Sequence, residues 1–471
     1  MSKFKLFVEN FLVYGLGGIL NRIVPFLMLP IITRLMPNTK YFGLNDLSNT
    51  IVQFGTAIAI MGMYDAVFRL FFDKDDFTYQ RKICSTALIF VFGIGTIISL
   101  ILYLFDLQVT LWIFESEEYK ILLHLTCISI FVGATNSIIA LPTRVQNKRK
   151  VFISIGLVSS ILSYSISVPL LLMGEFLIAL PLAGIITALI TEISFYIINR
   201  KWFSYRLFDI QILQNLLRIA LPLLPTFLIY WIFTSSDRLI IAKLLNNEAV
   251  GLYAVGAKIA SASQLIYTAF AGGWQYFAFS TMREENQVKN NSLVFEYLGI
   301  ISFISGLFVC AWSKSFFEIF FTGDYVNGYI VMPYLFLGPL LLMLYQVIGN
   351  QFLVIKKTWP GMLILSFGAI LNLLLNFCLI PVFGIEGAAI ATLIGYAVSV
   401  IICGFVLKKM SLVDIERRFI YLSLLMLFFM FLWRVYFINY LLISTTMAII
   451  FAICCALFYK IEILKLCRSI W

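Results

Sequence analysis

The chain is constrained above all by apolar runs that follow one another from Phe7 to Phe458, with only short polar breaks between them. A helix needs roughly 20 apolar residues to span a hydrocarbon core of about 30 Å. Hydrophobic residues make up 61% of the 471 residues and charged residues only 12%, about half the charged share of a soluble domain. A soluble fold could not bury this much apolar surface, so the sequence predicts an all-α polytopic membrane protein.

The polar breaks predict about fourteen transmembrane helices. These are expected at residues 7–33, 42–68, 83–104, 119–142, 151–173, 175–199, 216–242, 250–279, 292–313, 329–353, 360–381, 387–407, 418–437 and 440–460. The beginning of the chain resembles a signal peptide, but its apolar run continues to Thr33 without a small-residue cleavage site. We therefore interpret it as a retained first helix. The tight connection near Gly174 leaves a slightly smaller count open.

The basic residues predict the orientation, because cytoplasmic loops of membrane proteins are rich in lysine and arginine. With the N-terminus inside, the inner segments hold 25 of the 34 basic residues and the outer loops hold 5. Both termini are therefore expected in the cytoplasm. The same bias accounts for most of the net charge of +10, so no nucleic-acid partner is needed to explain it.

Cysteine and histidine usage favours neither a metal site nor a disulfide framework. The eight cysteines form no C-x-x-C pair, and most lie inside apolar runs. The single histidine is His124. We expect no metal site, no cofactor and no catalytic residue.

A faint internal repeat indicates a duplicated transporter. The segment from Arg34 resembles that from Lys243, and the break beginning at Val145 matches that beginning at Val354, both at an offset of 209. Because six spans separate the copies, they run in the same direction. The predicted parts are a six-helix bundle at 1–207, a second at 208–410, and two further helices at 411–471. Proline pairs in helix 1 (Pro25, Pro30) and helix 7 (Pro222, Pro225) are expected to bend both helices.

Basic residues inside predicted spans are candidates for substrate binding, because ionisable groups deep in a bilayer normally face a cavity or a partner. Arg22 lies eleven residues from the outer end of helix 1, about 16 Å at 1.5 Å per residue, too deep for easy snorkelling. Lys258 lies about 12 Å deep by the same count, and Arg238 is shallower. Snorkelling remains an alternative for those two. Arg22 and Lys258 are expected to converge in a cleft between the halves and to bind an anion, and phosphate suits arginine particularly well.

Acidic and amide side chains add candidates for ion coupling and for lining the cavity. Asp46, Asn49, Thr50 and Gln53 recur at helical spacing and predict one polar stripe, which either lines water or bonds to another helix. Neighbours in sequence do not face each other on a helix, so Asp237 and Arg238 are expected to have different surroundings. The candidates are Asn49 and Gln53 for substrate binding, and Asp46, Asp237 and Glu192 for ion coupling.

The run from Asn372 to Thr392, NLLLNFCLIPVFGIEGAAIAT, resembles the polysaccharide exporters of the multidrug, oligosaccharidyl-lipid and polysaccharide superfamily, which include O-antigen flippases. The opening from Tyr14 to Leu35 and the segment Gly62 to Arg69 resemble that family as well. The resemblance implies two six-helix bundles in the bacterial inner membrane that flip an undecaprenyl-diphosphate-linked oligosaccharide, an O-antigen or capsule repeat unit used in lipopolysaccharide or other polysaccharide biosynthesis. It also implies alternating access, coupling to H+ or Na+ as an open alternative, and a polysaccharide polymerase complex and membrane lipids as candidate partners.

Two other functions stay open on the sequence. A drug or cation exporter of the same superfamily would share the architecture but would prefer an acidic or apolar cavity. A membrane glycosyltransferase or polymerase could use Asp73 and Asp75 as a D-x-D motif, but the short loop around them has no room for a nucleotide-sugar domain. No phosphate-binding loop of an ATP-driven pump occurs in the sequence.

Overall fold

The computed structural model describes residues 23–268, 270, 274, 286–357 and 359–460. Within these ranges the regular structure is helical, with no strand. Twelve helices are long and apolar enough to cross a membrane, and a thirteenth span results if the bent pair α2 (Thr39–Ile60) and α3 (Met63–Leu70) counts as one. The apolar helix Ile23–Leu35 precedes them and falls on the first predicted span. The predicted class, an all-α polytopic membrane protein with about fourteen spans, is confirmed.

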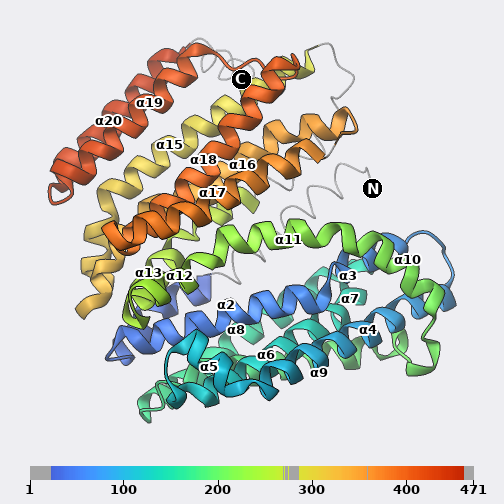
Figure 1. The fold of residues 1–471 in the computed structure, drawn as a ribbon. Coiled ribbons are helices and arrows are strands. Elements are labelled where there is room, and N and C mark those ends of the chain that lie inside the picture. Colours follow the sequence, from blue (N-terminus) through green and yellow to red (C-terminus); the bar gives the residue numbers. More distant parts are fainter. Residues whose placement is uncertain (1–22, 269, 271–273, 275–285, 358, 461–471) are drawn as a thin grey trace. The chain divides into compact units, whose positions relative to one another are not determined.

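The chain divides into two compact units, Met1–Ala254 and Val255–Trp471 (Figure 1). The remaining helices of the first unit are α4 (Phe77–Leu104), α5 (Asp106–Phe114), α6 (Lys120–Ile139), α7 (Leu141–Val145), α8 (Arg149–Leu172), α9 (Ala179–Asn199), α10 (Ile210–Ala220), α11 (Leu224–Trp231) and α12 (Asp237–Leu244). Helix α13 (Asn247–Ala260) begins in the first unit and ends in the second. The second unit contains α15 (Gln287–Phe320), α16 (Met332–Val354), α17 (Trp359–Phe383), α18 (Ile385–Lys409), α19 (Arg417–Leu432) and α20 (Leu441–Phe458).

Helices α10, α11 and α12 thus pack with the first six spans, which places the structural division later than residue 207. The three-part division at 207 and 410 was drawn from the repeat and stays a prediction.

The break between α2 and α3 has a local cause. Met61 and Gly62 both adopt left-handed backbone angles, with φ of 51° and 77°. A Cβ on Gly62 would lie 2.6 Å from the carbonyl oxygen of Ala220, so only glycine fits against this turn of α10. The two helices consequently meet at an angle of 41°.

The seventh predicted span, residues 216–242, is interrupted at its prolines, as the sequence predicts. A short 3-10 turn at Leu221–Leu223 contains Pro222, and Pro225 opens α11. A π-helical turn at Ile232–Ser236 then separates α11 from α12. In contrast, the residues Ile23–Leu35 remain helical through Pro25 and Pro30.

Backbone hydrogen bonds give independent evidence for the repeat. Asn147 after α7 and Lys356 after α16 both have a left-handed φ, of 56° and 58°, and are 209 residues apart (356 minus 147). Lys148 N donates to the oxygen of Thr143, and Lys357 N donates to that of Phe352, again at an offset of 209. The same helix-ending motif therefore occurs at equivalent places in the two halves, which confirms the predicted pseudo-repeat.

Candidate functional site

Helices α2 and α13 follow the start of the two matched repeat segments and cross in the first unit, where their backbones are in contact. A Cβ added to Gly43 of α2 would lie 2.0 Å from the carbonyl oxygen of Asn247, and one added to Gly251 of α13 would lie 2.0 Å from that of Thr39. The contact is reciprocal, because each glycine faces the first turn of the other helix. Only glycine allows helices to approach this closely.

A buried charge cluster lies next to this crossing. Arg238 on α12 donates through Nε to Asp46 Oδ2 on α2 at 2.6 Å, and through Nη1 to Asp237 Oδ1 at 3.0 Å. The side chains of Arg238, Asp46 and Asp237 are 15%, 9% and 3% exposed. Arg238 Nη1 also donates to the carbonyl oxygen of Thr234 at 2.6 Å. Because the three groups exclude most water, their mutual attraction is screened far less than it would be on a surface.

Tyr253 joins this cluster to α13. Its hydroxyl donates to Asp237 Oδ2, and the Arg238 guanidinium carbon lies 5.4 Å from the centre of its ring. Tyr253 itself is fully buried. The cluster therefore fastens α2, α12 and α13 to one another.

The π-helical turn at Ile232–Ser236 immediately precedes Asp237. Such turns are frequent at functional sites because they change which side chains share a helix face. Here Ser235 is buried and donates to Gln53 Oε1 at 3.3 Å, and Trp231 Nε1 donates to the carbonyl oxygen of Thr50 at 3.3 Å.

The predicted polar stripe on the second span is thus divided between two environments. Asp46 and Thr50 are buried and bond to Arg238 of α12 and Trp231 of α11, whereas the side chains of Asn49 and Gln53 are exposed. Bonding to another helix, one of the two roles that the sequence left open, therefore occurs at Asp46 and Gln53; lining water stays a prediction. The substrate-binding role of Asn49 and Gln53 stays a prediction.

The prediction that Asp237 and Arg238 have different surroundings is wrong. Arg238 pairs with Asp237 as well as with Asp46. The spacing rule describes where side chains leave a helix, but the long arginine side chain bends back along its own turn to the carboxylate of the preceding residue.

Three other candidates come from the sequence, and one of them, Arg22, lies outside the described residues. Lys258 is exposed near the end of α13. Glu192 is partly buried on α9 beside Thr135 of α6, away from the charge cluster. The roles of Arg22, Lys258 and Arg238 in substrate binding, and of Asp46, Asp237 and Glu192 in ion coupling, stay predictions.

Tyr253, Gly43 and Gly251 were missed as site residues. The two glycines follow the matched segments that begin at Arg34 and Lys243 and are 208 residues apart (251 minus 43), within one residue of the offset of those segments. That register was a usable signal for the crossing. Nothing in the pattern around Tyr253 distinguished it from the aromatic background.

This architecture is shared with known transporters and flippases. A structure of the lipid II flippase MurJ in an inward closed conformation matches with a TM-score of 0.74 and 18% identity, covering 96% of this chain and 100% of that chain. An inward-facing multidrug resistance MATE transporter of the MOP superfamily matches with a TM-score of 0.64 and 15% identity, covering 83% and 94%. A mutant of the Vibrio cholerae MATE transporter VcmN matches with a TM-score of 0.59 and 15% identity, covering 86% and 96%. The chain therefore has the fold of MurJ and the MATE transporters.

Within this class the chain belongs to a family of polysaccharide biosynthesis proteins, which matches residues 31–327. No curated protein matches it. The sequence-based assignment to the polysaccharide exporters of this superfamily is confirmed by the family match and the shared fold.

Proposed function

We propose that the protein is a flippase that moves a lipid-linked oligosaccharide, an undecaprenyl-diphosphate carrier bearing an O-antigen or capsule repeat unit, across the bacterial inner membrane. One observation carries the proposal: membership in a polysaccharide biosynthesis family together with a fold shared with a lipid II flippase. Flipping breaks no bond, so the proposed activity is transport and not catalysis.

The mechanism that we propose is alternating access with both termini in the cytoplasm. In this orientation α2 and α13 begin at the outer surface, so the Gly43–Gly251 crossing and the charge cluster would lie at the outer end of the bundle. Asp46, Arg238 and Tyr253 would then hold α2, α12 and α13 together at that end while the inner side accepts substrate. An outward opening that moves α12 away from α2 would require the ion pair between Asp46 and Arg238 to separate.

Ion coupling fits this arrangement through the same residues. The cluster has two carboxylates and one guanidinium, so with both carboxylates ionised it carries one net negative charge. A proton or a Na+ ion entering during the cycle would compensate that charge and bias the two states.

Flipping of a fluorescent undecaprenyl-diphosphate oligosaccharide by the purified full-length protein in liposomes tests the proposal. We expect Arg22→Ala and Lys258→Ala each to slow flipping about tenfold or more, because each removes one charge-assisted hydrogen bond worth ~1.5–3 kcal/mol. Lys148→Ala, which changes an exposed basic residue between α7 and α8, is the matched control and should keep the wild-type rate. Undiminished flipping in both test variants would contradict the predicted role of Arg22 and Lys258 in binding the diphosphate, and no flipping by the wild type would contradict the proposed activity.

The polymerase partnership and the drug-exporter alternative are tested in cells. A deletion strain should lose surface polysaccharide and accumulate lipid-linked repeat units on the inner side, with unchanged drug susceptibility. Increased drug susceptibility with normal polysaccharide would favour the exporter. Copurification of a polysaccharide polymerase with the tagged protein would support the complex.

A further inference from the structure

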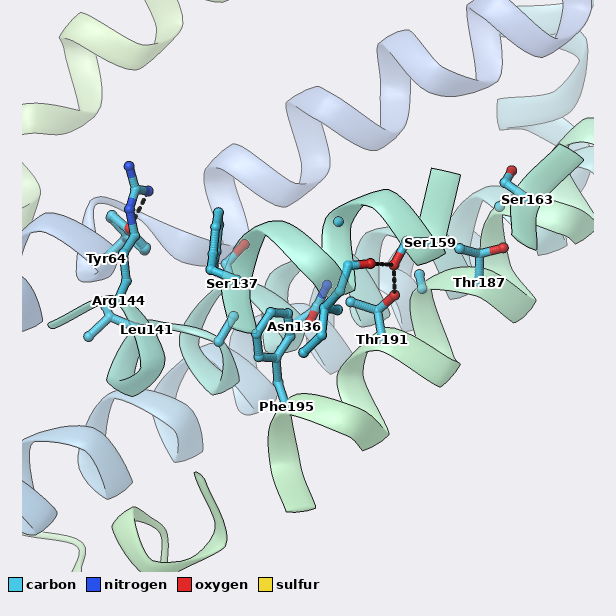
Figure 2. Close-up of a pocket in the computed structure, with 16 residues that line it drawn as sticks. Tyr64, Asn136, Ser137, Leu141, Arg144, Ser159, Ser163, Thr187, Thr191 and Phe195 are labelled. Carbon is cyan, nitrogen blue, oxygen red and sulfur yellow. Dashed lines mark hydrogen bonds between the residues drawn. The ribbon is translucent and has the colours of Figure 1, made fainter. Parts of the chain in front are cut away.

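The first unit contains a second polar feature that the charge cluster does not use. A pocket of about 510 Å³ lies among α6, α7, α8 and α9 (Figure 2). Its volume falls within the range of small-molecule sites. The polar residues that line it are Tyr64, Asn136, Ser137, Arg144, Ser159, Ser163, Thr187 and Thr191.

One end of the pocket is cationic. Arg144 is exposed and its Nη1 donates to the Tyr64 hydroxyl at 2.6 Å. Its guanidinium carbon lies 5.6 Å from the centre of the Phe152 ring, and Phe152 in turn lies 6.0 Å from Phe195. A guanidinium has five N–H donors, so Arg144 can bind an anion and keep its bond to Tyr64.

The other end is neutral and rich in hydroxyl groups. Ser159 and Thr191 share a hydrogen bond of 2.7 Å in the middle of the pocket, with Thr187 and Ser163 beyond them (Figure 2). Thr187 is only 7% exposed, and its Oγ1 has no hydrogen-bond partner among the described residues. Asn136 Oδ1, which also lines the pocket, likewise has no hydrogen-bond partner within the described part of the chain. Buried polar atoms are rarely left unpaired, which points to a ligand with hydroxyl groups.

The two ends are far enough apart to set the length of the ligand. Phe195, which contacts Phe152 beside Arg144 and lies between Arg144 and Thr187 in Figure 2, is eight residues from Thr187 on α9, so the two ends are at least about 12 Å apart at 1.5 Å per residue. An extended chain advances about 1.2 Å per covalent bond, so this distance corresponds to roughly ten bonds. A phosphate with a single glycerol is too short to contact both ends, whereas a phosphate with two sugar rings is long enough.

We propose that this pocket binds a glycosyl phosphate of about disaccharide length, with its phosphate on Arg144 and its hydroxyl groups on Asn136 and Thr187. A lipid acyl chain would leave Thr187 Oγ1 unpaired, which disfavours a phospholipid as the occupant. The pocket lies within one unit, and its binding of saccharide does not depend on flipping. If the proposed function holds, it is a holding site for the saccharide end of the cargo, whose lipid stays outside the bundle.

Asp65 on α3 provides a negative charge near the proposed phosphate position. It is exposed and close enough to Arg144 for their charges to interact. An anion at Arg144 would be repelled by this carboxylate, so Asp65→Asn should tighten binding of a charged probe and leave binding of an uncharged saccharide unchanged.

Calorimetric titration of the purified full-length protein in detergent with maltose 1-phosphate tests the proposal. We expect Arg144→Gln to weaken binding about tenfold or more and Thr187→Val about fivefold, the latter from loss of one neutral hydrogen bond. Glucose 1-phosphate and inorganic phosphate should bind more weakly and should not respond to Thr187→Val, because they do not reach that end.

Matched controls are Lys148→Gln, an exposed basic residue outside the pocket wall, and Thr96→Val, an exposed threonine on α4. Both should bind maltose 1-phosphate as the wild type does. Equal affinity for inorganic phosphate and maltose 1-phosphate, or wild-type binding by Thr187→Val, would overturn the proposal. Displacement of the probe by dioleoyl phosphatidylglycerol would also overturn it, because the occupant would then be a lipid. Intact binding with no flipping in liposomes would refute the proposed function and leave this site standing.

Discussion

In the charge cluster of the first unit, Arg238 is expected to contribute strongly to the stability of the fold, because it pairs with two buried carboxylates. Arg238→Gln removes the cation that compensates Asp46 and Asp237, whose side chains are 9% and 3% exposed. Two carboxylates then remain buried on neighbouring helices. The Tyr253 hydroxyl still donates a hydrogen bond to Asp237, so Asp46 loses more of its charge compensation than Asp237 does.

The magnitude follows from the geometry. Arg238 bonds to Asp46 at 2.6 Å and to Asp237 at 3.0 Å, and removing one partner of such a buried pair destabilises by about 3–5 kcal/mol. Asp46→Asn alone should be mild, about 1 kcal/mol, because Arg238 keeps its pair with Asp237 and only one hydrogen bond is weakened. The double variant Asp46→Asn, Arg238→Gln should regain part of the loss, since one buried charge fewer is left unpaired.

The assay is a double-mutant cycle on the free energy of unfolding of the purified protein in mixed micelles, read by tryptophan fluorescence. Arg218→Gln, which removes an arginine from the last turn of α10, is a matched control and should cost less than about 1 kcal/mol. An Arg238→Gln variant within 1 kcal/mol of the wild type would refute the reasoning. So would a double variant no more stable than Arg238→Gln alone.

Three further predictions concern other parts of the chain. Gly43→Ala should destabilise by about 1–3 kcal/mol because its Cβ would lie 2.0 Å from a backbone oxygen, whereas Gly93→Ala, with nothing within 4 Å, should stabilise by about 0.5–1 kcal/mol; thermal unfolding measures both. Arg434→Gln should cost about 1–3 kcal/mol by leaving Glu386, 7% exposed, without its bidentate partner at 2.5 and 2.7 Å, and Glu386→Gln added to it should restore stability in the same assay. Lys82 holds the pKa of Asp209 below its usual value, so this pair stabilises the fold above about pH 4 and the contribution disappears as pH falls through the lowered pKa. Unfolding measured between about pH 2 and 6 should show less pH dependence in Asp209→Asn, which keeps a capping oxygen for α10; an unchanged profile would contradict the assignment.

The spans were predictable because their signal is local and large. Each predicted span from residue 83 onward overlaps a helix or helix series of the structure, from Phe77–Leu104 to Leu441–Phe458. The helices run past the predicted ends, for example Gln287–Phe320 against 292–313, because polar residues continue a helix into the interface. Apolar run length fixes the part that must lie in hydrocarbon and does not fix where the helix stops.

The break at Met61 and Gly62 and the π-helical turn at Ile232–Ser236 were not predictable in the same way. Gly62 is required by its contact with Ala220, which lies 158 residues further along the chain (220 minus 62). The π-helical turn occurs in an Ile-Phe-Thr-Ser-Ser segment that also suits an ordinary helix. Both features follow from packing between distant segments and not from local sequence preference.

The candidate site shows the same limit at the level of side chains. Asp46, Asp237 and Arg238 were identified as ionisable groups that need partners, and they are partners of one another. The rule that a charge in a membrane needs compensation found the residues. It could not decide between a ligand and a neighbouring side chain, because both satisfy the charge.

The glycine crossing follows the internal repeat, whereas the charge cluster does not. The Gly43 and Gly251 contacts are reciprocal, and Thr39 and Asn247, which meet them, stand 208 residues apart like the glycines themselves (247 minus 39, 251 minus 43). The charges do not follow this symmetry. At the offset of 208 that relates α2 to α13, Asp46 corresponds to Ala254, and at the offset of 209 that relates the segments before these helices, Arg238 corresponds to Leu29; both counterparts are buried apolar residues. The glycine crossing is therefore a property of the duplicated scaffold, whereas the charge cluster joins Asp46 of the first copy to Arg238 of the second and has no charged counterpart at the matching positions. Under alternating access, a substitution at either glycine should consequently disturb the crossing to a similar extent, while neutral variants of the cluster should change the balance between conformations with the crossing left intact.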